Sequence, residues 1–303
     1  MKEHSLLNLV VYLHDSHCIP YYTKLIQSIK EKFSCHTICI VPEGFQEPKL
    51  DNCKIIEVKA ANSDHLHLTL FSYLLPDIPI YLLWGQDLLD ENSILTKLQH
   101  FSHRLIFDSD TSVDLISLSN YLKSITQEHS IEIIDLNWLR ISGWREVLLK
   151  VFDTSVKVDQ LKKSKKITIY YNCIEDGHAT HSYRGGYYIQ LWLASRFSWH
   201  LESEEKKEDS YFYHYKECSV TLIPQKHSHL FAGGITRVDI SSENEQTIMH
   251  RTIDDFRKVR IEAFDQEKCQ IHFPESSKIP PQINWKSLYF PQVLHRIPEL
   301  HRV

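Results

Sequence analysis

The stretch LLNLVVYLHDSHCIPYYTKLIQSIKEKFSCHTICIV, residues 6–41, decides the fold class. Its first eight residues, Leu6–Leu13, are apolar and rich in valine and leucine, which predicts a buried strand. Pro20 then opens an amphipathic helix over Tyr21–Phe33, and Thr37–Val41 has the composition of a second buried strand. Two apolar strands joined through a helix are typical of a parallel sheet.

The same alternation continues as far as residue 152. It predicts strands at Lys54–Val58, Ile78–Trp84, Arg104–Phe107 and Ile131–Ile134, and helices at Leu66–Leu75, Ser93–Phe101, Val113–Ile125 and from Asp135 to Phe152. We therefore predict a Rossmann-like α/β domain over residues 1–153, with helices on both faces of a parallel sheet.

The second half of the chain has a different rhythm. Thr154–Lys166 is polar and lysine-rich, which favours a solvated linker. A strand at Ile167–Cys173, a helix at Gly186–Phe197 and a series of short strands separated by turns follow it. This pattern predicts an α+β domain over residues 154–303 with mostly antiparallel strands.

Composition excludes several classes of protein. The chain has 34 Lys+Arg against 39 Asp+Glu, a net charge of −5, which argues against a nucleic-acid binder. Its 8 glycines form neither a G-x-G-x-x-G nor a P-loop motif, so we expect no nucleotide cofactor. The 7 cysteines include no C-x-x-C, and no signal peptide or membrane span is evident. We expect a cytoplasmic protein without a metal site or a membrane partner.

Polar and aromatic residues collect where the predicted parallel strands end. Functional groups of open α/β sheets lie at these carboxyl ends. The candidates for binding a small metabolite are His14, Trp84, Asp87 and Asp108. Asp108 and Asp110 could bind a cation or sugar hydroxyls, but two aspartates that end a strand more often cap a helix. A zinc site in the cluster around His14 is disfavoured, because close neighbours in one loop cannot surround a tetrahedral ion.

The segment DLNWLRISGWREVLLKVFD, residues 135–153, is the most informative. Its apolar residues recur at helical spacing, and Ser142 is placed to cap a helix that starts at Gly143. Core packing is the simplest interpretation of such a stripe. Tryptophan and arginine are also the residue types that anchor protein–protein contacts. The candidate partner-binding residues are Asp135, Asn137, Trp138, Arg140, Trp144 and Arg145.

This segment closely resembles the signature of the OpcA family, the glucose-6-phosphate dehydrogenase assembly proteins. Three further stretches resemble that family in the same order and spacing: LPDIPIYLLW at 75–84, RLIFDSD at 104–110 and LWLASRFSW at 191–199. The resemblance covers roughly residues 65–200. One departure is that Ser142-Gly143 stands where the family usually has Thr-Pro.

The resemblance implies a protein without catalytic residues that promotes the assembly or activity of glucose-6-phosphate dehydrogenase in the oxidative pentose phosphate pathway. The partner that it implies is glucose-6-phosphate dehydrogenase itself. We expect the Trp138–Arg145 region to contact this partner, and Asp135 and Asn137 to position the loop. Two alternatives stay open from the residues. One is an enzyme acting on a sugar phosphate or nucleotide through His14, Asp87, Asp108 and Asp135. The other is a metabolite sensor using the same strand ends.

Overall fold

A computed structural model describes residues 5–14, 16–31, 33–45, 52–58, 65–128, 131–174, 181–243, 245–252, 255, 258–263 and 266–272. The chain divides into two compact units, Met1–Leu136 and Asn137–Val303. The sequence predicts the boundary between residues 153 and 154, which is 17 residues after the end of the first unit at Leu136. The difference concerns the helical segment after residue 136, which groups with the second unit.

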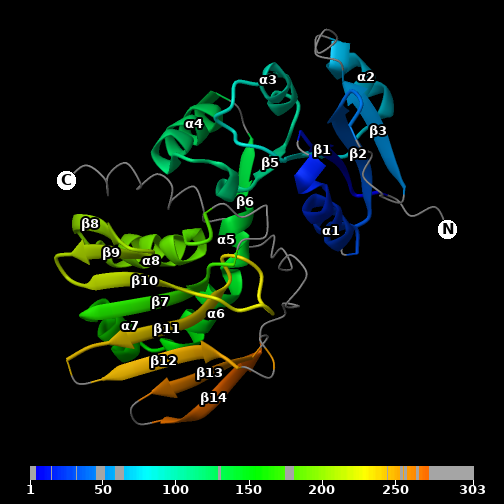
Figure 1. Cartoon of the computed structure of the whole chain (residues 1–303). Coiled ribbons are helices and arrows are strands. Elements are labelled where there is room, and N and C mark those ends of the chain that lie inside the picture. The colour runs from blue at the N-terminus through cyan, green and yellow to red at the C-terminus, as the bar shows by residue number, and fades with distance from the viewer. Residues whose placement is uncertain are drawn as a thin grey trace. The chain divides into compact units, whose positions relative to one another are not determined.

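The first unit is built on a six-stranded parallel sheet in the order β3-β2-β1-β4-β5-β6 (Figure 1). The strands are β1 (Leu7–Tyr12), β2 (Cys35–Pro42), β3 (Cys53–Val58), β4 (Ile80–Trp84), β5 (Arg104–Phe107) and β6 (Glu132–Asp135). All six residues of β1 are buried, as expected for the central strand of a sheet covered on both faces. This confirms the predicted Rossmann-like parallel sheet.

Helices cover both faces of this sheet. They are α1 (Ile19–Lys30), α2 (Leu66–Tyr73), α3 (Ser93–Gln99) and α4 (Leu115–Glu128). The strand order reverses between β1 and β4. Because crossovers between parallel strands are right-handed, this reversal places α1 on one face and α2, α3 and α4 on the other. The β1/β4 pair is therefore the topological switch point, where ligands bind in sheets of this type.

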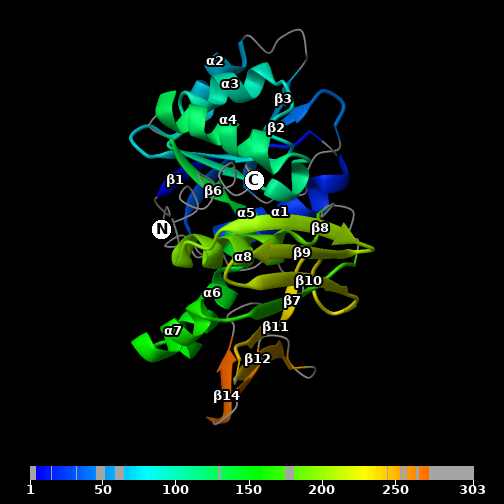
Figure 2. The same cartoon turned by 90° about the vertical axis from the view of Figure 1, so that its left-hand side faces the viewer.

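The second unit contains an eight-stranded sheet in the order β14-β13-β12-β11-β7-β10-β9-β8 (Figure 2). Its strands are β7 (Lys166–Asn172), β8 (Leu201–Lys207), β9 (Ser210–Tyr215), β10 (Ser219–Gln225), β11 (Ile235–Ser241), β12 (Gln246–Arg251), β13 (Lys258–Ala263) and β14 (Gln266–His272). Only the β7–β10 pair is parallel among the paired strands described. The predicted, mostly antiparallel α+β arrangement is confirmed.

Four helices belong to the segment that follows β6 and to the second unit: α5 (Leu136–Arg140), α6 (Ser142–Val151), α7 (Ser155–Lys162) and α8 (Arg184–Phe197). α8 packs on β7 and β10. Gly186, near its start, allows this close approach, because a Cβ there would stand only 3.2 Å from Leu222 and 3.3 Å from Ile169. Within the described residues, no helix is long and apolar enough to cross a membrane.

Two local predictions were wrong, and one strand was not predicted. The expected linker at 154–166 contains the helix α7, which Thr154 caps by accepting a hydrogen bond from the Lys157 amide and which buries Leu161. Ser142 is the first residue of α6 and makes no capping bond, so the cap position falls on Ile141. The charged strand β8 was not predicted, because its sequence, LESEEKK, lacks an apolar pattern. The strand forms by pairing with the edge of β9.

Candidate functional site

Two stacked aromatic rings stand at the switch point of the parallel sheet. Tyr12 ends β1 and Trp84 ends β4, and the two residues pair in register. Their ring centroids lie 4.2 Å apart with nearly parallel planes. Both residues are buried, whereas His14 beyond them is exposed. Trp84 thus belongs to the interior of this unit. A metabolite could reach His14 but not Trp84.

The carboxylates at the ends of β5 and β6 both bind the backbone of the loop that follows β5. Asp108 accepts a hydrogen bond from the Asp110 amide at 3.1 Å and one from the Tyr21 hydroxyl at 3.3 Å. Asp135 accepts a bond from the Ser109 amide at 3.1 Å. The structure therefore brings Asp108 and Asp135 together around one short 3₁₀ turn, and both are buried.

Asp87 is held in a similar way, apart from that turn. Its carboxylate accepts a hydrogen bond from the Leu89 amide at 3.0 Å, in the loop that follows β4. No group of three His, Cys, Asp or Glu residues in the described part of the chain could hold a metal ion. These carboxylates stabilise turns, and Asp108 caps the short 3₁₀ turn Ser109–Thr111, as the capping interpretation of that residue predicts.

The residues at the switch point do not fit a dinucleotide. Rossmann folds hold the pyrophosphate with glycines in the turn between the first strand and the first helix. Here residues 13–18 contain no glycine. Pro20 occupies the first turn of α1, where it lacks the backbone N–H that would face a phosphate. Gly85 lies nearby, but a Cβ there would meet the Tyr12 carbonyl oxygen at 2.7 Å, so it serves strand packing.

The Trp138–Arg145 pair forms an internal stack. The guanidinium of Arg145 lies 3.8 Å from the centre of the Trp138 ring and donates a hydrogen bond to the Trp138 carbonyl oxygen at 3.4 Å. Trp138 is 1% exposed and Arg145 8% exposed. Burial lowers the pKa of Arg145 to about 10, which still leaves the guanidinium charged at neutral pH. This stack ties the start of α6 to α5.

Trp144 joins α6 to the sheet of the second unit. Its indole N–H donates a hydrogen bond to the Ile235 carbonyl oxygen at 3.1 Å, at the start of β11. Arg251 of β12 donates to the same oxygen at 2.7 Å, and its guanidinium lies 5.8 Å from the centre of the Trp144 ring. Trp144 is 1% exposed. Both tryptophans of the segment 135–153, Trp138 and Trp144, are therefore buried.

Arg140 is the member of the predicted set that reaches the surface. It is half-buried, and its guanidinium donates a hydrogen bond to the side-chain oxygen of Asn137 at 2.8 Å. Asn137 is itself buried. The two residues lie one helical turn apart on α5, so the amide holds the arginine in a defined direction.

An apolar groove lies where α6, α7 and α8 meet, and the sequence analysis did not single it out. It encloses about 290 Å³. Its lining residues are Leu148, Leu149, Phe152, Val158, Leu161, Trp192, Leu193, Arg196 and Phe197. The available signal was the pair of apolar residues Leu149 and Val158, which point away from the core stripe and are exposed.

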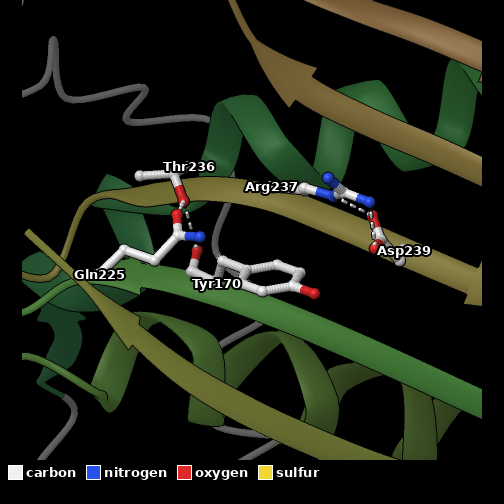
Figure 3. A network of polar contacts seen from close by, with 5 residues as sticks. All are labelled: Tyr170, Gln225, Thr236, Arg237 and Asp239. Atoms are coloured by element: carbon white, nitrogen blue, oxygen red, sulfur yellow. Dashed lines mark hydrogen bonds and ion pairs between the residues drawn. The ribbon is translucent and has the colours of Figure 1, made fainter. Parts of the chain in front are cut away.

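A polar network occupies the face of the second sheet opposite α6 and α8 (Figure 3). Arg237 donates two hydrogen bonds to the carboxylate of Asp239, at 2.6 and 2.7 Å, and this partner raises the pKa of the arginine. Thr236 donates to the Gln225 side-chain oxygen at 2.9 Å and lies 3.2 Å from the Tyr170 carbonyl oxygen. Arg237 and Asp239 neutralise each other, so this part of the face carries no net charge.

Comparisons with known proteins identify the family. The model of the glucose-6-phosphate dehydrogenase subunit N-terminal domain matches residues 54–124, and that of the C-terminal domain of the same subunit matches residues 131–288. The chain is 26% identical over 142 residues to the OxPP cycle protein OpcA of Nostoc punctiforme, a match that covers 46% of this chain and 28% of that protein. It is 25% identical over 155 residues to OpcA of Synechococcus elongatus, covering 48% and 32%. The chain thus matches about a third of the length of these relatives.

Solved structures share the fold at low identity. UDP-N-acetylglucosamine 3-dehydrogenase GnnA from Acidithiobacillus ferrooxidans aligns with a TM-score of 0.58 at 7% identity, over 97% of this chain and 87% of that one. A super-repressor mutant of Gal80p from Saccharomyces cerevisiae aligns with a TM-score of 0.55 at 10% identity, over 90% and 83%. A dehydrogenase and a repressor share this architecture, so the fold does not assign an activity. The two subunit-domain models, one of which spans more than half of the chain, place the protein in the OpcA family of glucose-6-phosphate dehydrogenase subunits.

Proposed function

We propose that this protein is a non-catalytic assembly factor and activator of glucose-6-phosphate dehydrogenase, acting in the oxidative pentose phosphate pathway. The observation that carries the proposal is the match of the chain to two models, which are described as the N-terminal and C-terminal domains of a subunit of that enzyme. The named relatives, OxPP cycle proteins, agree with the same pathway.

Two features support a role without catalysis. The turn after β1 has no glycine and the first turn of α1 contains Pro20, which argues against a bound nicotinamide cofactor. The carboxylates of Asp108 and Asp135 accept backbone hydrogen bonds in a buried turn, where a substrate would have to displace them. A general acid or base must instead reach the proton that it transfers.

The mechanism that we propose is differential binding. The protein binds the assembled, active form of the dehydrogenase more tightly than its inactive form and so shifts the equilibrium between them. The shift cannot exceed the ratio of the two affinities. Such an activator needs a recognition surface, and it needs no reactive group of its own.

We assign the direct contact in the predicted segment to Arg140. Arg140 is half-buried as a residue, and Asn137 orients its guanidinium through the 2.8 Å hydrogen bond. Trp138, Trp144 and Arg145 then act as positioning residues that fix α5 and α6 from inside. Arginine held in a defined direction suits a carboxylate on the partner, because its planar fork can donate two parallel bonds.

The test is a titration of the cognate dehydrogenase with this protein, with activity and sedimentation velocity followed in parallel. We expect a saturable rise in activity together with a co-sedimenting complex. Arg140→Ala should weaken the complex by about 3- to 30-fold, the range for a removed charged contact at about 0.7–2 kcal/mol. Arg104→Ala, which removes a partly buried arginine paired with Glu132 in the other unit, is the matched control.

Two results would contradict these assignments. Unchanged activity and the absence of a complex at any ratio would overturn the proposed function. Normal binding by a folded Arg140→Ala variant would leave the function standing and would remove Arg140 from the contact surface.

A further inference from the structure

The groove between α6, α7 and α8 combines a closed apolar floor with an exposed apolar rim. Leu148, Phe152 and Leu193 form part of the floor and are buried. On the rim, Leu149 is 55% exposed and Val158 38% exposed. Exposed aliphatic side chains bordering an apolar hollow are typical of a surface that another protein covers.

One arginine lines this groove, and the segment that carries α7 is rich in lysine, although the whole chain carries −5. Arg196 of α8 is exposed and lines the groove, and no carboxylate pairs with it in the described part of the chain. Six lysines and two aspartates stand between Lys150 and Lys166, along α7 and its flanks. One of the aspartates, Asp153, is already paired with Lys157 at 3.0 Å. Arg196 at the groove, together with the excess of lysine along the α7 segment, favours an occupant with negative charge.

The shape and chemistry of the groove favour a protein segment as its occupant. Small-molecule sites are commonly about 300–1,000 Å³ and carry several convergent polar groups. This groove, at about 290 Å³, lies at the lower end of that range, and among the described residues Arg196 is the only charged one that lines it. An amphipathic helix lays apolar side chains into such a groove and leaves its charged side chains at the rim. Acidic side chains on that helix would match the positive rim.

We propose that this groove, lined by α6, α7 and α8, docks an amphipathic segment of the dehydrogenase that is apolar on one side and acidic at its edge. The inference rests on the proposed function and names the surface that performs it. It adds to Arg140, which belongs to α5, a second contact region built from residues farther along the chain. The apolar rim supplies the buried area, and Arg196 with the α7 lysines sets the orientation and accelerates the encounter.

The experiment measures the Kd between the full-length chain and the purified cognate dehydrogenase by calorimetry. The double variant Leu149→Glu, Val158→Glu places two acids on the apolar rim, and Arg196→Glu reverses the charge beside it. We expect the double variant to raise Kd at least about tenfold. Arg196→Glu should raise it several-fold and flatten its dependence on salt. Val113→Glu, at an apolar side chain that is 82% exposed in the other unit, is the control and should leave Kd within twofold.

The outcomes separate the two proposals. Failure of the unmodified chain to bind the dehydrogenase would overturn both the proposed function and this docking surface. Binding by the unmodified chain, with folded groove variants that bind equally well, would overturn the docking surface alone. A drop in Tm of the groove variants at constant Kd would show that the chain itself fills the groove, which also overturns it. Arg196→Glu keeps the test valid if the double variant fails to fold, since that side chain is exposed.

Discussion

The role of Trp144 can be decided by a single conservative substitution. Trp144→Phe keeps an aromatic ring inside the second unit and removes the N–H that donates to the Ile235 carbonyl oxygen at 3.1 Å. That oxygen retains the bond from Arg251 at 2.7 Å, so no acceptor is left without a donor. The loss is therefore the net value of one buried hydrogen bond, about 1 kcal/mol.

The smaller ring also opens a cavity. At about 24 cal/mol per Å³, a void of a few tens of Å³ costs about 1 kcal/mol more. We expect Trp144→Phe to lower the free energy of unfolding by about 2 kcal/mol, and Trp144→Ala by about 3–5 kcal/mol. The Kd for the dehydrogenase should stay unchanged in the phenylalanine variant, because the Trp144 side chain is 1% exposed.

The assay is urea unfolding followed by far-UV circular dichroism, with the m value compared between variants. Trp192→Phe is the matched control. The Trp192 ring is half-buried in the wall of the groove, and we expect this change to cost less than about 1 kcal/mol and to raise the Kd instead. Equal stability costs for the two variants would refute the packing argument. A raised Kd with unchanged stability in Trp144→Phe would make Trp144 a direct contact.

Three further predictions test the rest of the molecule. Asn172→Ala should lower the free energy of unfolding by about 2–4 kcal/mol, because the buried Asn172 amide forms hydrogen bonds with four backbone groups of the loop at residues 227–231. Urea titration measures this cost, and a value below about 1 kcal/mol would contradict the prediction. Burial raises the pKa of the Cys218 thiol from 9.0 to about 12, so the native state keeps a proton that the unfolded chain loses. Unfolding experiments should show stability falling as pH rises from about 9 towards 12, and Cys218→Ala should flatten that slope. The sulfurs of Cys39 and Cys53 lie 2.9 Å apart, and their shared hydrogen bond lowers the pKa of Cys53 and raises that of Cys39. Iodoacetamide should therefore modify Cys53 before Cys39, which peptide mass spectrometry detects, and the reverse order would contradict the assignment.

The sequence predicted the architecture well because its signals are local. The buried β1 strand and the helices α1 and α8 follow from apolar runs and from 3.6-residue spacing, which neighbouring residues alone determine. The charged strand β8 was missed for the same reason, since it depends on pairing with β9 and not on its own composition. The helix α7 was missed because the segment 154–166 holds five lysines, which outnumber the two exposed valines and the buried Leu161 of the helix.

The candidate site divides in the same way. Composition and motifs by themselves determined the class of fold, the absence of a glycine-rich phosphate turn and the resemblance to the OpcA family, all of which are written in contiguous residues. Which side chains reach the surface was decided only by tertiary structure. Arg140 and Arg145 look alike in the sequence, but packing buries one against Trp138 and leaves the other half-exposed. The groove likewise exists only where α6 and α7 meet α8, which begins 22 residues after α7 ends. Such long-range contacts set burial, and no local pattern records them.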